Sequence, residues 1–112
     1  MCGCAKPDKV KDYPSQDPDI FLFAETYYGK GAITSDNLRV YVNLRNKGKL
    51  DRVLVLEGAF TVEHVSWFSK NEVKICLSDG ISNIYRNIAP LNANGRSENI
   101  RIDLEIPCKS ER

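Results

Sequence analysis

The sequence has little that catalysis or nucleic-acid binding would require. It contains one histidine, His64, and no glycine-rich phosphate loop, HExxH sequence or calcium-binding loop. Its 16 basic and 15 acidic residues nearly cancel, whereas nucleic-acid binding usually needs a surplus of lysine and arginine. No apolar run approaches the roughly 20 residues that a transmembrane helix needs. The composition therefore predicts neither a nucleic-acid partner nor a membrane-spanning helix.

The single histidine does not predict an active site either. Ser66 and Ser69 lie near His64 in sequence, but their spacing supplies no third group to orient an imidazole base. His64 has the same parity as the apolar residues before it, which favours a place at the end of a strand. Asp103 and Glu105 indicate a solvated charged strand face. We expect a non-enzymatic protein with no catalytic residue, metal or cofactor.

Length and composition fit one globular domain preceded by a polar tail. The 112 residues are 42% hydrophobic and 28% charged, which leaves room for a single core. Residues 1–19 contain Pro7, Pro14 and Pro18 among polar residues, so this segment cannot bury enough apolar area to offset its ordering entropy. We expect residues 1–19 to form a flexible tether and residues 20–112 to form a single β-rich domain.

The domain shows the alternation that is typical of β-strands. Residues 38–45 and 100–106 alternate apolar and polar side chains, and residues 20–24 form a continuous apolar run. Turn residues recur about every ten residues, as at Asn46-Lys47-Gly48-Lys49 and Asn94-Gly95. About seven short strands and no convincing helix predict an antiparallel sandwich, immunoglobulin-like in the loose sense, with a small barrel as the alternative.

Residues 81–88 fit both helical and strand spacing. Their β-branched content favours a strand, and we expect Pro90 to end it.

Cys76 and Cys108 are the natural disulfide pair. A bridge that closes about 30 residues would stabilise the domain by roughly 3–4 kcal/mol. Cys76 has the opposite parity to its apolar neighbours, so the bridge needs a bulge or a bend at Pro107; two buried free thiols are the alternative. Cys2 and Cys4 lack the spacing of zinc ligands, and we expect no zinc site.

The start of the chain, Met1-Cys2-Gly3-Cys4, precedes a polar, proline-spaced stretch. It resembles the processed start of a bacterial lipoprotein, in which a cysteine after a small residue carries lipid. Gly3 makes Cys4 the first candidate for lipidation, and Cys2 is the second. The resemblance implies that a leader is removed. Neither Gly3 nor Ala5 is the aspartate that retains such proteins at the inner membrane, which implies the periplasmic face of the outer membrane.

Two features indicate binding of another protein. Trp67 and Phe68, flanked by serines, read as an exposed loop pair, and such aromatic residues are good interface anchors. The alternative is that one or both cover the core. The second feature is a basic hairpin that could face an acidic protein or anionic lipid headgroups, formed by Arg39, Arg45, Lys47, Lys49 and Arg52.

We therefore expect a lipid-anchored protein-binding module, of the kind to which immunity proteins and inhibitors belong. A structural subunit of an envelope assembly is the first alternative. A carrier of a small ligand is the second, and it would need an open apolar cavity.

Overall fold

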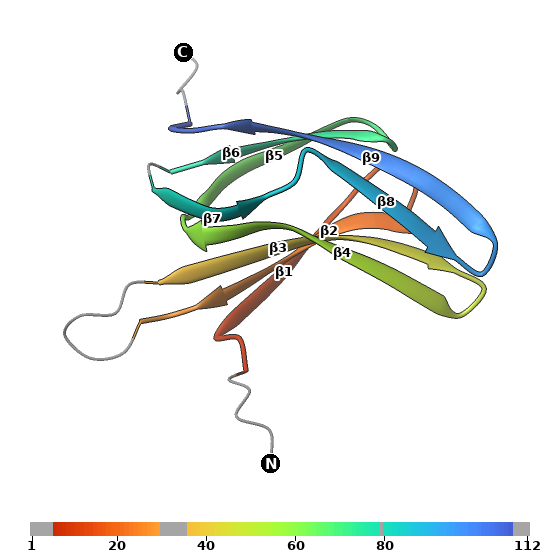
Figure 1. Cartoon of the computed structure of the whole chain (residues 1–112), viewed down its shortest axis with the longest axis horizontal. Helices are drawn as coiled ribbons and strands as arrows, with labels where there is room; N and C mark the ends of the chain where they lie inside the picture. The colour runs from red at the N-terminus through yellow and green to blue at the C-terminus, as the bar shows by residue number, and fades with distance from the viewer. Residues whose placement is uncertain (1–5, 30–35, 79, 109–112) are drawn as a thin grey trace.

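The computed structural model describes residues 6–29, 36–78 and 80–108, which form nine strands in two packed sheets (Figure 1). The five-stranded sheet contains, in spatial order, β1 (Lys9–Pro14), β2 (Ile20–Tyr27), β3 (Asn37–Asn46), β4 (Lys49–Ala59) and β7 (Ile81–Tyr85). The four-stranded sheet contains, in spatial order, β5 (Val62–Ser69), β6 (Glu72–Leu77), β9 (Arg96–Glu105) and β8 (Ile88–Ala93).

Paired strands are antiparallel except β6 and β9, which run parallel. The predicted sandwich is confirmed, with nine strands instead of about seven. The two sheets do not close into the alternative barrel over the described residues, because β1, β7, β5 and β8 remain edges. In this part of the chain, no helix has the length and apolar character to cross a membrane.

One face of each sheet supplies the core between them. In β3, the side chains of Leu38, Val40, Val42 and Leu44 are almost completely buried, and the residues between them face outward. In β9, Ile100 and Ile102 are buried in the same way. The alternation read from the sequence therefore determines which side of each strand enters the core.

Part of the expected tether is instead strand β1, Lys9–Pro14. This segment pairs along β2, with Lys9 opposite Thr26 and Pro14 opposite Phe21. Its polar composition concealed the strand, because an edge strand needs only one partner and can leave its side chains in water. Residues 1–5, which include Cys2 and Cys4, lie outside the described part of the chain.

Two local predictions also need correction. Trp67 and Phe68 lie within β5, and the turn follows them at Lys70-Asn71. Residues 81–85 form strand β7, as predicted, but the chain bends at residue 87 and a separate strand, β8, begins at Ile88. Pro90 lies inside β8 and does not end a strand. Because β8 is an edge strand, it tolerates a residue that lacks a backbone N–H donor.

Both predicted hairpin turns are present. In the β3–β4 turn, Lys47 and Gly48 have φ angles of 51° and 80°, and in the β8–β9 turn Asn94 and Gly95 have φ angles of 52° and 87°. Two consecutive positive φ angles are what a tight two-residue hairpin turn requires. The two turns lie side by side at one end of the sandwich (Figure 1), where Nδ2 of Asn46 donates to the carbonyl of Ala93 at 3.1 Å.

The predicted disulfide between Cys76 and Cys108 is confirmed, with Cα atoms 4.9 Å apart. The side chain of Cys76 points to the outer face of β6, and Cys76 is paired with Glu105 of β9. Cys108 follows the bend at residues 106–107, and its N–H donates to the carbonyl of Leu77 at 2.7 Å. The bend brings Cys108 to the outward side of β6 and ties the chain after β9 to β6; β5 also shifts register between Val62 and His64, next to Cys76.

Candidate functional site

The outer face of the five-stranded sheet carries arginines stacked on aromatic rings. These side chains occupy positions that alternate with the buried core residues of the same strands. We use the name arginine–aromatic face for the surface formed by Phe21, Phe23 and Tyr27 of β2, Arg39, Tyr41, Asn43 and Arg45 of β3, and Arg52 of β4.

Arg52 has the most contacts on this face. Its guanidinium carbon lies 4.7 Å from the ring centre of Phe23 and 5.0 Å from that of Tyr41. Its Nε donates to Oδ1 of Asn43 at 3.0 Å. These distances are within the range at which a ring face attracts a cation. The rings and the amide together restrict the orientation of the guanidinium group.

The two ends of the face differ in charge. At one end, Arg39 stacks on Tyr27 at 5.2 Å, and its Nε also donates to Glu57 at 3.0 Å, which raises the pKa of Arg39. At the other end, Arg45 stacks on Phe21 at 4.9 Å. Among the described residues, neither Arg45 nor Arg52 forms an ion pair with a carboxylate. This end of the face therefore keeps its positive charge.

Asn43 lies beneath this positive end. Its side chain is fully buried, and the strand register places it between Phe21 and Arg52. Its Nδ2 is the buried side-chain polar atom that has no hydrogen-bond partner among the described residues. An unpaired buried donor costs about 1–3 kcal/mol, so this amide is a candidate to bind an acceptor that the chain itself does not supply.

The basic hairpin predicted from the sequence lies at the same end. Lys47 and Lys49 flank the β3–β4 turn and are exposed, as are Arg45 and Arg52. The structure therefore places these four predicted contact residues at one end of the sandwich. Arg45 and Arg52 face outward, whereas Lys49, opposite Asn46, has the parity of Asp51 on the inner side of β4. The carboxylate of their neighbour Asp51 accepts from the backbone N–H groups of Asn92 and residue 52, and it forms no ion pair with these cations among the described residues.

The structure separates Trp67 from Phe68. They are consecutive in β5, so their side chains point to opposite faces of the strand. Trp67 packs against the core, and its Nε1 donates to the carbonyl of Tyr13 at 3.0 Å, which joins β5 to β1 across the two sheets. Phe68 is 58% exposed on the outer face of the four-stranded sheet.

The six predicted contact residues therefore do not form one surface. The alternative that one aromatic residue covers the core holds for Trp67. Phe68 lies on the other side of the sandwich from Arg45 and Arg52.

A hollow of about 450 Å³ lies on the outer face of the four-stranded sheet. It is lined by His64, Ser66, Phe68, the Cys76–Cys108 bridge, and Lys74 and Glu105, whose Nζ and Oε1 atoms form an ion pair at 2.9 Å. The hydrogen bonds of the described residues include none between the histidine and the serine. Within the described ranges, no three metal-ligating side chains are grouped.

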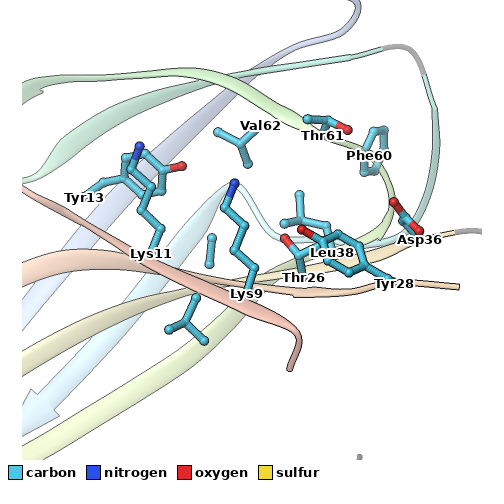
Figure 2. Close-up of a pocket in the computed structure, with 12 residues that line it drawn as sticks. Lys9, Lys11, Tyr13, Thr26, Tyr28, Asp36, Leu38, Phe60, Thr61 and Val62 are labelled. Carbon is cyan, nitrogen blue, oxygen red and sulfur yellow. The ribbon is translucent and has the colours of Figure 1, made fainter. Parts of the chain in front are cut away.

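A smaller cavity of about 140 Å³ opens between the sheets beside β1. Figure 2 shows the side chains of Lys9 and Lys11 reaching into it above Leu38, with Phe60 and Val62 on the opposite side. It is smaller than the roughly 300 Å³ that pockets for small ligands usually reach. Inward-pointing lysines on an edge strand protect the sheet from pairing with another chain, which explains this arrangement.

A polar network closes one end of the sandwich. Arg96 of β9 donates to Asp17 at 2.6 Å and to Glu98 at 3.0 Å. The hydrogen bond from Arg96 is the main reason that the pKa of Asp17 lies below its ordinary value. The pKa of Glu98 is lowered mainly by a hydrogen bond from Asn71, and the hydrogen bond from Arg96 lowers it further. The network joins the β1–β2 connection, the β5–β6 turn and β9.

Sequence reasoning missed the ring members of the arginine–aromatic face and Asn43. Phe21 and Phe23 belong to a continuous apolar run, in which no alternation marks an outward face. The available signal was that Phe21 and Phe23 lie two residues apart and so share one face of β2. The strand register places this face beside the outward face of β3 that carries Arg39 and Arg45. No protein-family model, curated protein or solved structure matches this chain.

Proposed function

We propose that this protein is a non-enzymatic protein-binding module of the bacterial cell envelope, anchored by a lipid on Cys4 or Cys2. The single observation that supports binding is the stacking of Arg52 over the rings of Phe23 and Tyr41 on an open sheet face. Arginine and aromatic residues are enriched at the centres of protein interfaces, because they bury large areas and form directed hydrogen bonds.

The contact surface of this module is the arginine–aromatic face, in place of the Trp67–Phe68 pair. Trp67 is engaged with the core and with Tyr13, so a partner could not bury it without disrupting the sandwich. The guanidinium groups of the face are already held by rings, so less side-chain entropy is lost when a partner binds. Immunity proteins and inhibitors of secreted toxins or hydrolases are the kind of binder that this proposal includes.

The carrier alternative has less support. It requires a roomy apolar cavity, and the space between the sheets is about 140 Å³ with two lysines reaching into it. The larger hollow of about 450 Å³ lies on the outer face of the four-stranded sheet, and its lining includes His64, Ser66 and the Lys74–Glu105 ion pair. A structural subunit of an envelope assembly would use the same face, and it differs from an inhibitor in the identity of the partner.

The binding proposal is tested by affinity capture from envelope extracts with two matched variants. Arg52→Glu changes the centre of the face, and Arg101→Glu changes a cation on the other sheet whose side chain is 70% exposed. We expect the native protein and Arg101→Glu to capture the same partner and Arg52→Glu to lose it. Equal capture by both variants, with both folded, would contradict the assignment of this face.

The localisation proposal is tested by replacing the two N-terminal cysteines singly with serine. We expect the native protein to fractionate with membranes and one serine variant to be released from them. Recovery of the full-length native protein, unlipidated, from the cytosol would contradict the lipid anchor. This result would leave the protein-binding proposal to be decided by the capture experiment.

A further inference from the structure

We infer that the positive end of the arginine–aromatic face binds clustered aspartate and glutamate side chains of a partner protein. This inference rests on the proposed protein-binding function and adds the chemistry of the partner. The positive end consists of Arg45, Lys47, Lys49 and Arg52, together with the buried amide of Asn43.

The first argument is the unbalanced charge. Ion pairs hold Arg39, Arg96 and Arg101, and the nearby carboxylates of Asp17 and Asp19 are paired with Arg96. Arg45 and Arg52 have rings in place of carboxylates, over the part of the chain that the structure describes. The remaining charge is available to an acidic partner, and it would steer such a partner towards this end.

The second argument is the geometry of the cations. A guanidinium group presents N–H donors in a planar fork that matches the two oxygens of a carboxylate. Arg52 uses Nε for Asn43, and its plane is held by Phe23 and Tyr41. The donors on its terminal nitrogens make no hydrogen bond to another described residue. The fork is therefore partly oriented before any partner arrives.

The third argument is independent of the charges. The Nδ2 group of Asn43 is a buried donor without an acceptor among the described residues, and Oδ1 of the same amide accepts from the exposed side chain of Arg52. A modest movement of Arg52 would let a carboxylate oxygen accept from this amide and from the guanidinium group together. A carboxylate thus supplies the acceptor that this buried donor lacks.

The surroundings favour compact groups of carboxylates over an extended polyanion. Glu25 and Glu57 lie on the same face one strand position beyond Phe23 and Tyr41, and Asp12 is opposite Phe23 on β1. A nucleic acid or a lipid bilayer extending past the positive end would meet these acidic residues. The net charge of +1 likewise offers no broad attraction for phosphate groups.

The test uses the full chain and two short peptides that differ only in glutamate or glutamine at alternate positions. We expect the glutamate peptide to bind and to shift the NMR signal of the Asn43 side-chain amide. Binding should weaken at least about tenfold when salt rises from about 50 mM to about 500 mM. Arg45→Gln with Arg52→Gln should weaken it by about tenfold, whereas Arg101→Gln should leave it unchanged.

Lys47→Gln with Lys49→Gln provides a second variant, because both side chains are exposed, Lys47 in the turn and Lys49 at the start of β4, and neither belongs to the core. We expect a smaller loss of binding, concentrated at low salt. Equal binding of the two peptides would overturn the inference. So would tighter binding to a single-stranded oligonucleotide, or to vesicles of phosphatidylglycerol and phosphatidylethanolamine, than to the glutamate peptide.

The two proposals can fail separately. A partner that is captured through Arg52, yet keeps its affinity and salt dependence when Arg45 and Arg52 become glutamine, refutes the carboxylate inference only. Failure to capture any protein, together with specific binding of the glutamate peptide, refutes the protein-binding function and shows that the site recognises free acidic ligands.

Discussion

On the outer face of the four-stranded sheet, Lys74 forms a 2.9 Å ion pair with Glu105. On the outer face of the five-stranded sheet, Arg52 lies over the neighbouring rings of Phe23 and Tyr41. Both cations point outward from a strand, but an ion pair neutralises its charge whereas a ring holds a cation and leaves its charge in place. The comparison shows how a chain with almost no net charge can still present one positive surface.

The two sheets also differ in how they are held. The four-stranded sheet has the Cys76–Cys108 bridge, which joins β6 to the chain just after its parallel neighbour β9. The five-stranded sheet has long antiparallel ladders, such as that between β3 and β4, and no disulfide among its described residues. Variants on the two sheets can therefore separate covalent stabilisation from stabilisation by packing and stacking.

The largest expected effect is loss of the disulfide. Cys76→Ala with Cys108→Ala should lower the free energy of unfolding by about 3–4 kcal/mol, because the unfolded chain regains loop entropy. The melting temperature should fall by about 10 °C or more, as measured by circular dichroism. An unchanged melting temperature would show that the bridge does not hold the four-stranded sheet.

Trp67→Ala should have the next largest effect. We expect a loss of about 2–3 kcal/mol, since Trp67 packs on the core and donates to the carbonyl of Tyr13. Phe68→Ala is the matched control, and it should change stability by less than about 0.5 kcal/mol because the ring is 58% exposed. Similar losses in chemical denaturation would contradict the opposite orientations of these neighbours.

Acid should weaken the network that closes one end of the sandwich. The pKa values of Asp17 and Glu98 are lowered in the folded protein, so their contribution is complete above about pH 5 and is lost as the pH falls through and below their ordinary values of 3.8 and 4.5. We expect roughly 1 kcal/mol from these partly exposed contacts. Arg96→Met should make the free energy of unfolding depend less steeply on pH in the acid range, as measured by chemical denaturation at several pH values. An identical pH profile in the native protein and the variant would rule out the network as its source.

The smallest expected effect separates stacking from ion pairing. Arg52→Ala should cost about 0.5–1 kcal/mol, because Phe23 and Tyr41 lose their cation and Asn43 loses a donor. The ring stack should make this loss insensitive to salt. Lys74→Ala on the other sheet should show a loss that high salt reduces. Equal salt dependence in the two variants would remove the distinction between the faces.

The sequence predicted much of the sandwich, because strand alternation and turn chemistry are local. The outward parity of Arg39 and Arg45 was visible in the alternation of β3, and both tight turns contain glycine at a position that needs positive φ. Strand β1 was missed since an edge strand with polar side chains carries no such pattern. Only part of the candidate site was predicted, namely its basic hairpin.

The rest of the site depends on neighbours in space. The sequence by itself determined which side chains of each strand face outward and which cysteines are available to pair. Tertiary structure decided that Phe23 lies beside Tyr41 and that Arg52 covers Asn43, because such contacts follow from strand order and register. It also decided that β6 pairs in parallel with β9 and that Trp67 turns inward. These outcomes depend on long-range pairing, which local periodicity does not specify.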